Sequence, residues 1–375
     1  MRISVSVLAL LFYTYFGYPV IILLLGRIRN IKVHKIQFEP KVTVIVAAYN
    51  EEKYIKNKLM NALELDYPAD RLEVLMISDG STDNTINLAH SINNPSLRVF
   101  EQKRSGKAAA LNFALSEAAG DFLLFTDANV FFNKDSLRHM VALLGDPNIG
   151  AVTGKVNLVA LDTSEPLGEG VYMRYERFLQ KYETMFSSVV GTDGGMFLAK
   201  RDLVDKIPDD TILDDFYIVM RIILKGKRVV YTEEAVADEY VPASIVQEFK
   251  RKSRIAAGGF QVLARLPKLL VFVSNYRFLF QFYSHKLLRW LAPLMLIILY
   301  ISTFPSANND YGLVLFVSQN IFYAMAILGR LSPRLRRMNV FYLCYYFTAM
   351  NLAVLVGMIK AITKTQAVTW QRVNR

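Results

Sequence analysis

Several common features are missing from the sequence, and each absence excludes a class of protein. Cys344 is the only cysteine in 375 residues, so neither a disulfide framework nor a cysteine-based metal site is possible. No GxGxxG pattern follows the first apolar run, VTVIVAA at 42–48, which argues against a dinucleotide-binding Rossmann domain.

Charge is absent from four stretches that are each close to the length needed to cross a bilayer. These stretches are 3–26, 290–309, 311–329 and 338–359. They account for a hydrophobic content of 53%, which is too high for a purely soluble protein. The first lacks an obvious small-residue cleavage site, so we expect an uncleaved transmembrane anchor at 1–28. The others predict C-terminal transmembrane helices at 290–360, with buried helices of a soluble core as the alternative.

Basic residues beside these stretches predict the orientation of a multi-pass cell-membrane protein. Arg27, Arg29, Lys32 and Lys35 follow the first stretch, and Arg330, Arg334, Arg336 and Arg337 separate the last two. The rule that cytoplasmic loops carry the positive charge places the catalytic part in the cytoplasm. It also places the basic tail, 361–375, outside, in conflict with the same rule. A late segment that is interfacial or re-entrant would remove this conflict.

The formal net charge of +11 indicates anionic partners. The basic residues gather next to the apolar stretches, so membrane lipids are expected partners and nucleic acid is not. Positive charge interleaved with apolar residues at 246–289 predicts amphipathic segments in the headgroup layer. A basic, solvated helix face is the alternative for this segment.

Between 41 and 245 the sequence alternates apolar runs with helical patterns, which predicts an α/β domain. Runs ending at Ala48, Ser78 and Thr126 have the character of buried parallel strands. Asp79 and Asp127 follow two of these runs. Both carboxylates should therefore emerge at the carboxyl edge of the sheet, where open α/β folds bind ligands.

Six motifs occur in a specific order along the chain. They are VAAYNE at 46–51, SDGSTDNT at 78–85, KRSGKAAALN at 103–112, TDAN at 126–129, LDD at 213–215 and RKSRIAAGG at 251–259. The ordered set resembles membrane-anchored members of glycosyltransferase family 2, the group that includes cellulose and hyaluronan synthases. The resemblance implies a GT-A domain with a mixed, largely parallel sheet. It also implies transfer of a sugar from a UDP-sugar to a lipid-linked or saccharide acceptor.

The resemblance assigns roles to individual residues. Those assigned to the nucleotide-sugar are Ala48, Tyr49, Glu51, Asp79, Lys107, Asp127, Ala128, Arg251 and Arg254. Lys107 opens a helix, where backbone N–H groups already favour anions such as a diphosphate. The purely structural alternatives are that Asp79 caps a turn and that Lys107 is an exposed charge on a helix.

A divalent cation, Mg²⁺ or Mn²⁺, is the implied cofactor. Asp127 and Asn129 stand where the family has Asp-x-Asp, so the second ligand is an uncharged carbonyl. A hard cation at this position would neutralise the diphosphate as it leaves.

Asp214 and Asp215 compete for the role of general base, because consecutive helical residues point about 100° apart. The family motif assigns the base to Asp215, inverting the anomeric carbon, and Asp214 suits the helix cap. Gly194, Gly195 and Asp214 are expected on the acceptor side.

Ile255 stands where the family's processive synthases have Trp, which favours limited transfer over polymer synthesis with secretion. A catalytically silent sugar-nucleotide-binding subunit of an export complex is the alternative from another class.

Overall fold

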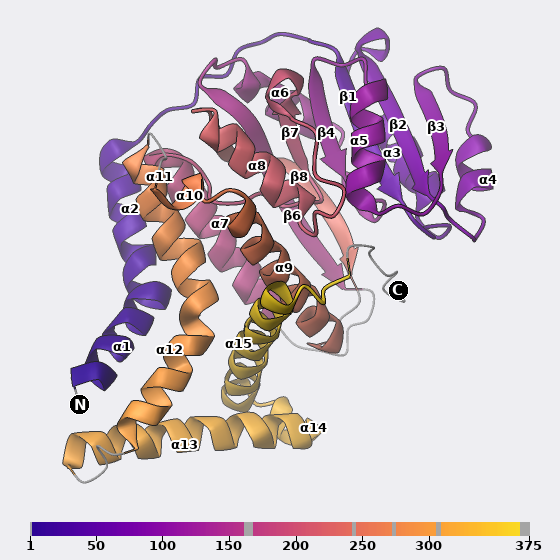
Figure 1. Cartoon of the computed structure of the whole chain (residues 1–375). Coiled ribbons are helices and arrows are strands. Elements are labelled where there is room, and N and C mark those ends of the chain that lie inside the picture. Colours follow the sequence, from indigo (N-terminus) through magenta and orange to yellow (C-terminus); the bar gives the residue numbers. More distant parts are fainter. Residues whose placement is uncertain (1, 161–167, 242–244, 272–274, 305–308, 368–375) are drawn as a thin grey trace.

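The computed structural model describes residues 2–160, 168–241, 245–271, 275–304 and 309–367. Its catalytic part is built on one eight-stranded sheet with the order β3-β2-β1-β4-β7-β6-β8-β5 (Figure 1). The strands are β1 (Val42–Ala48), β2 (Leu72–Asp79), β3 (Leu97–Gln102), β4 (Phe122–Thr126), β5 (Val130–Phe132), β6 (Ile149–Ala160), β7 (Phe197–Lys200) and β8 (Arg228–Val241).

The first four strands are parallel, as the alternating pattern predicted. All seven residues of β1 are buried, because helices cover both faces of the sheet. The side chains of Val44 and Val46 join an apolar cluster with α3 (Ile55–Leu63) and α6 (Ser136–Leu144). Those of Ile45 and Ala47 join a second cluster with α5 (Lys107–Glu117) and α8 (Asp214–Leu224). The short helix α4 (Thr85–His90) connects β2 and β3.

The other strands make the sheet mixed. β7 pairs antiparallel with β4 and β6, β6 pairs parallel with β8, and β5 pairs antiparallel with β8. The expected mixed, mostly parallel α/β architecture is confirmed. Short 3-10 helices lie at Ala69–Arg71 and Arg201–Leu203.

Four helices within the described residues are long and apolar enough to cross a membrane: Arg2–Arg29, Tyr276–Thr303, Asp310–Leu331 and Asn339–Thr363. The first comprises α1 (Arg2–Phe12), a π-helical turn (Tyr13–Gly17) and α2 (Tyr18–Arg29). The second comprises α11 (Tyr276–Gln281), another π-helical turn (Phe282–Leu287) and α12 (Leu288–Thr303). The last two are α13 (Asp310–Leu331) and α15 (Asn339–Thr363), separated by α14 (Pro333–Arg336).

The second of these helices begins 14 residues before the predicted start at Trp290. The length of the uncharged stretch underestimated this helix, because charged side chains near the beginning of the helix pack against protein. Arg289 pairs with Glu176 of α7 (Gly168–Phe186), and His285 Nδ1 lies 2.7 Å from Glu183 Oε1 on the same helix. Residues 276–289 therefore continue without a break into the second candidate span.

The rest of the basic segment forms α9 (Ile245–Arg265) and α10 (Lys268–Val271). α9 is wedged between the catalytic part and the membrane helices. A Cβ on Gly258 would lie 2.6 Å from Leu213 Cβ, and one on Gly259 would lie 2.5 Å from the Trp290 ring. The tail beyond Ala367 lies outside the described residues.

Candidate active site

The predicted acidic residues meet at one edge of the sheet because β1 lies between β2 and β4. Ala48 pairs in register with Ser78, and Val46 pairs with Thr126. The loops that follow these three strands therefore leave the sheet side by side. Parallel strands with a shared carboxyl edge are the expected location for a ligand site.

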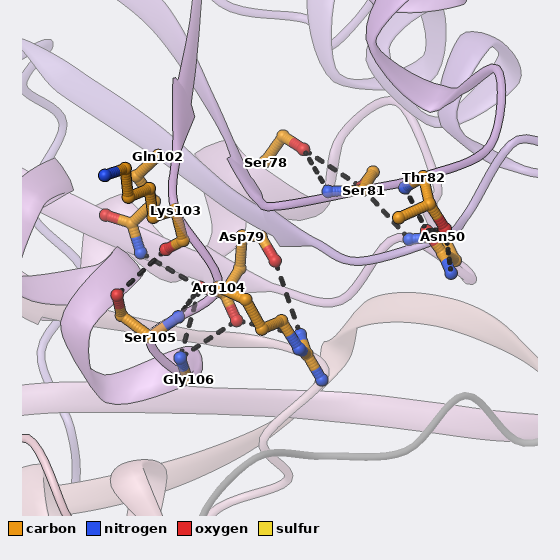
Figure 2. Close-up of polar contacts among 10 residues, drawn as sticks. All are labelled: Asn50, Ser78, Asp79, Ser81, Thr82, Gln102, Lys103, Arg104, Ser105 and Gly106. Atoms are coloured by element: carbon orange, nitrogen blue, oxygen red, sulfur yellow. Dashed lines mark hydrogen bonds and ion pairs between the residues drawn. The ribbon is translucent and has the colours of Figure 1, made fainter.

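The carboxylate of Asp79 is fully buried and holds the loop that follows β3 (Figure 2). It accepts hydrogen bonds from the backbone N–H of Ser105 at 2.7 Å and of Gly106 at 3.0 Å. The guanidinium of Arg104 also donates to it at 2.8 Å, and the Gln102 amide donates at 3.1 Å. With these donors in place, the carboxylate of Asp79 is fully occupied in shaping the loop.

Tyr49 and Arg104 form a flat surface at the same edge. The Arg104 guanidinium lies 3.2 Å from the centroid of the Tyr49 ring. Close approach is possible because Gly80, whose φ is +68°, packs directly on the Arg104 backbone; a Cβ there would lie 2.7 Å from its nitrogen. A stacked cation and aromatic ring is a suitable platform for a nucleobase.

The loop after β1 is bonded to the loop after β2. Asn50, with φ of +54°, accepts from the Thr82 N–H at 2.8 Å, and its own N–H donates to Ser81 Oγ (Figure 2). The Glu51 N–H donates to Thr85 Oγ1 at 2.8 Å. Ala48 is buried beneath this loop, so of the predicted donor residues here Tyr49 and Glu51 remain nearest the surface.

Lys107 joins the donor side of the site to the acceptor side. Its Nζ donates to Asp127 Oδ1 at 2.9 Å and lies 3.5 Å from Asp214 Oδ2. Burial alone lowers the pKa of Lys107, but the negative charges of Asp127 and Asp214 outweigh it and raise that pKa above its ordinary value. The lysine is therefore a fixed cation at the first turn of α5.

Asn129, the second residue of the predicted metal pair, uses its side-chain nitrogen to bond to β8. Its amide is buried and donates to Glu239 Oε1 at 3.3 Å and to the Tyr240 carbonyl at 3.0 Å. These bonds brace β8 against the loop, and Ala128 is buried beside it. The described residues contain no group of three or more His, Cys, Asp or Glu side chains that could hold a metal by themselves.

Lys58, which the sequence analysis did not identify, bonds to residues on either side of Asp127. Its amine is completely buried and donates to Thr126 Oγ1 at 2.9 Å and to the Val130 carbonyl at 2.5 Å. Burial holds the pKa of Lys58 well below its usual value. A lysine among the apolar positions of α3 was the available signal, because such a residue needs polar partners when buried.

Asp214 is not the helix cap that the sequence predicted. Leu213 occupies the cap position of α8 without a side-chain hydrogen bond, and Asp214 is the first helical residue. The carboxylate of Asp214 turns toward Lys107 instead, because an ion pair in a buried site is worth more than a cap in water.

Asp215 follows Asp214 on α8 and faces the loop that carries Gly194 and Gly195, which we call the glycine loop. Burial, followed by repulsion from Asp214, raises the pKa of Asp215 to about 7. A Cβ on Gly194 would lie 2.9 Å from Asp215 Oδ2, so the absence of a side chain at 194 makes room for this carboxylate. A buried acid with a pKa near neutrality has the properties of a general base.

The glycine loop is held by Asp193, which the sequence analysis did not single out. Its Oδ1 accepts from the Gly195 N–H at 3.1 Å, and its own N–H donates to Thr153 Oγ1 at 3.2 Å. A Cβ on Gly195 would lie 2.8 Å from Val130. The loop is therefore pressed against both the Asp127 loop and α8.

The two arginines of α9 lie close to the cleft without meeting Asp79. Arg254 Nη2 lies 3.4 Å from the Ile212 carbonyl, two residues before Asp214. Arg251 pairs with Glu248 at 2.8 Å. Burial raises the pKa of Asp193, and the positive charge of Arg251 opposes this shift only in part. Both arginines belong to α9, which packs between the α/β domain and the membrane helices.

A conserved-domain comparison agrees with this geometry, since residues 43–207 match the family model described as glycosyl transferase family 2. Residues 43–207 form a family 2 glycosyltransferase domain. Among solved structures, a mannosyltransferase from Pyrobaculum calidifontis in complex with GDP-Man and Mn²⁺ superimposes with a TM-score of 0.73. That match has 24% identity and covers 97% of this chain and 100% of the other, and it shows the GT-A fold.

Two curated relatives are similar in sequence over 233 residues. A poly-beta-1,6-N-acetyl-D-glucosamine synthase of Staphylococcus aureus is 32% identical over 60% of this chain and 56% of its own length. A beta-monoglucosyldiacylglycerol synthase of Synechocystis is 30% identical over 59% of this chain and 48% of its own length. The match thus spans about half the length of these relatives.

Proposed function

We propose that this membrane protein is an inverting glycosyltransferase that uses a UDP-sugar and a divalent cation to glycosylate a lipid-linked or saccharide acceptor. The proposal depends on one observation above all. Lys107 contacts both Asp127 and Asp214, and Asp215 follows directly, so a fixed cation and a basic carboxylate share one cleft.

The donor side supports a nucleoside diphosphate-sugar. The stacked Tyr49 and Arg104 pair would carry the base, and the first turn of α5 with Lys107 would receive the diphosphate. Asp79 keeps both parts in place by accepting from Arg104 and from the Gly106 N–H. The solved mannosyltransferase holds GDP-Man, so the choice of UDP for this chain is the part of the proposal that a donor screen must decide.

The residues present suit a cation that is shared with the substrate. Asp127 offers a carboxylate at the strand end, and the side-chain nitrogen of Asn129 bonds to β8, so that only its carbonyl oxygen could serve as a second, uncharged ligand. A protein that supplies one carboxylate leaves the other positions of an octahedral ion to phosphate oxygens and water, as Mg²⁺ and Mn²⁺ sites commonly do. When bound, the cation would offset the charge that develops on the leaving diphosphate.

On the acceptor side, Asp215 would remove the proton from the attacking hydroxyl. Its pKa of about 7 matches this task, and Gly194 allows a sugar or headgroup to approach the carboxylate. Attack from the Asp215 side, opposite the departing diphosphate, inverts the anomeric carbon. The position of α9 and Arg254 places this side toward the membrane helices, which favours an acceptor anchored in lipid.

The membrane helices lead us to place the catalytic part in the cytoplasm, where nucleotide-sugars are made. Single-sugar transfer remains our proposal for the product, because Ile255 replaces the aromatic residue of processive synthases. Product length with a radiolabelled donor separates the two: one discrete product supports limited transfer, and a ladder supports polymer synthesis.

The test is release of UDP by the purified protein with each of several UDP-sugars, with GDP-Man as comparison, in the presence of a membrane lipid extract. We expect release to require acceptor and Mg²⁺ or Mn²⁺, and to stop when EDTA removes the cation. The substitution Asp215→Asn should lower turnover on the order of 10²- to 10⁴-fold while UDP affinity is kept.

Asp202→Asn is the matched control, because Asp202 is an exposed acid of the same domain. Its activity should equal that of the unsubstituted protein. Full activity of Asp215→Asn would reject the assignment of the base. Tight donor binding without UDP release under any condition would instead favour a silent binding subunit.

A further inference from the structure

The N-terminal helix and α12 run antiparallel and fix which end of each lies near the catalytic part. Ser4 Oγ donates to Ser302 Oγ at 3.1 Å, and the Tyr13 hydroxyl lies 2.7 Å from Ser284 Oγ. Arg29 and Tyr276 therefore lie at the catalytic end. Arg2 and Thr303 lie at the opposite end, which we call the far end (Figure 1).

α15 also finishes at the catalytic end. A Cβ on Gly357 would lie 2.4 Å from the Ser253 carbonyl, so the backbones of α15 and α9 are in contact. α9 in turn packs on Leu213, directly before the acidic pair of the active site. Only one helix thus separates the last turns of α15 from the catalytic cleft.

These contacts limit how often the chain can cross the bilayer. It leaves the catalytic end at Tyr276 and is back there by Gly357. A chain that returns to the same side has crossed an even number of times. Three candidate spans lie in this interval, α12, α13 and α15, so they cannot all cross.

α13 is the helix that does not cross, because both of its neighbours meet it at their far ends. Tyr300 and Thr303, in the last turns of α12, bond to Asn320 and Gln319 in the middle of α13. In the first turns of α15, the backbone of Phe341 packs on Gly329. Figure 1 shows α13 running across the far ends of α12 and α15.

We infer that α13 lies in the plane of the membrane, within the leaflet remote from the catalytic part, with lipid as its partner. The chain then crosses three times, and its C-terminal tail lies on the catalytic side. Apolar side chains of α13 are exposed for contact with lipid, among them Val314 at 62%, Ile321 at 54% and Ile327 at 58%. Asp310 and Arg330 mark the two ends of the helix and lie at one depth.

Membrane thickness agrees with this arrangement. The N-terminal helix is free of hydrogen bonds to the charged helix α7 from Arg2 to about Thr14, because the Tyr175 hydroxyl of α7 donates to the Tyr15 carbonyl at 3.0 Å. That length is roughly 18 Å at 1.5 Å per residue, and a helix lying flat adds about 10 Å. Together they match a hydrocarbon core of about 30 Å.

The positive-inside rule does not oppose the inference, because basic residues are equally numerous at the two places concerned. Arg330, Arg334, Arg336 and Arg337 lie between α13 and α15, and Lys360, Lys364, Arg372 and Arg375 lie at the end of the chain. One group must face each side in either topology, so geometry decides. In this topology the C-terminal tail obeys the positive-inside rule, and the basic residues around α14 conflict with it instead.

Single cysteines test the topology, since Cys344 is the only native cysteine and Cys344→Ser gives a background without one. Lys56→Cys reports the catalytic side, and Asp310→Cys reports the far side in both topologies. Arg337→Cys and Thr365→Cys distinguish them. Each variant is reacted with a membrane-impermeant maleimide in sealed vesicles of known orientation, and a Tm in detergent equal to that of the unsubstituted protein shows that it is folded.

We expect Arg337→Cys to be labelled from the same side as Asp310→Cys, and Thr365→Cys from the same side as Lys56→Cys. The opposite assignment of both positions would show that α13 crosses the bilayer and would overturn the inference. Labelling of both from one side would mean that α15 does not cross, which would overturn it as well. None of these outcomes depends on the proposed donor or acceptor.

Discussion

At the scale of single residues, the site contains three neighbouring carboxylates whose electrostatic surroundings differ. Lys107 stabilises the negative charge of Asp127 and Asp214, whereas Asp215 bears the cost of burial beside them. Two neighbouring acids on one helix thus acquire different tasks. Asp214 contacts the lysine, and we propose that Asp215 accepts a proton.

The raised pKa of Asp215 predicts how activity varies with pH. A general base works only when deprotonated, so kcat/KM should fall as the pH decreases through about 7, approaching tenfold per pH unit below it. The measurement is the initial rate of UDP release at low acceptor concentration across pH 5 to 9. The residual activity of Asp215→Asn should lack this step, and a shared step would assign the titration to another group.

The contact between Gly194 and Asp215 predicts a second effect. In Gly194→Ala the new Cβ would lie 2.9 Å from Asp215 Oδ2, so the carboxylate must move and turnover should fall on the order of 10²-fold. Gly191→Ala is the control, since its Cβ meets only the flexible end of Lys286 at 3.2 Å. That variant should stay within about twofold of the original activity. Equal activities of the two would refute the steric argument.

At the scale of elements, α9 is the connection between catalysis and membrane. Glycines allow three close contacts of this helix: its own Gly258 meets Leu213 and its Gly259 meets Trp290, while Gly357 of α15 meets its Ser253. The basic character of this helix suggested a segment lying among headgroups. Its buried small residues show that packing against protein occupies one face, and no charge pattern reveals that.

Gly357→Ala tests this connection. The added methyl group would lie 2.4 Å from the Ser253 carbonyl and 2.7 Å from Ala256 Cβ, which should cost about 1–3 kcal/mol and lower the Tm by a few degrees. Thermal unfolding in detergent, followed by tryptophan fluorescence, measures it. Leu352→Ala, at a position 49% exposed toward lipid, should leave the Tm nearly unchanged. A Tm unaffected by Gly357→Ala would mean that the two helices are not in firm contact.

At the scale of the whole molecule, the first half of the domain was predictable and the second was not. β1 and β4 are buried on both faces and appear as unbroken apolar runs, so Val42–Ala48 and Phe122–Thr126 were found at their true bounds. β6 and β8 carry exposed or half-buried polar residues such as Lys155 and Glu233, so their 12 and 14 residues gave no comparable signal.

The same division holds for the site. Lys107, Asp127 and Asp215 could be proposed from the sequence because motifs are local, and the structure brings Lys107 to Asp127. Lys58 was missed because its partners, Thr126 and Val130, are 68 and 72 residues away. Pairing over such distances depends on the finished fold. The cap predicted for Asp214 failed for this reason too, since Lys107 attracts it from another helix.

Trp290 has a consequence for how this protein can be handled. It packs edge to face on Phe216 of α8 with 5.7 Å between ring centroids, and both belong to the apolar cluster beneath the sheet. Cutting the chain before Tyr276 would uncover that cluster to water. A soluble catalytic fragment should therefore aggregate, and heat should melt the sheet and release the helices from detergent in one cooperative transition.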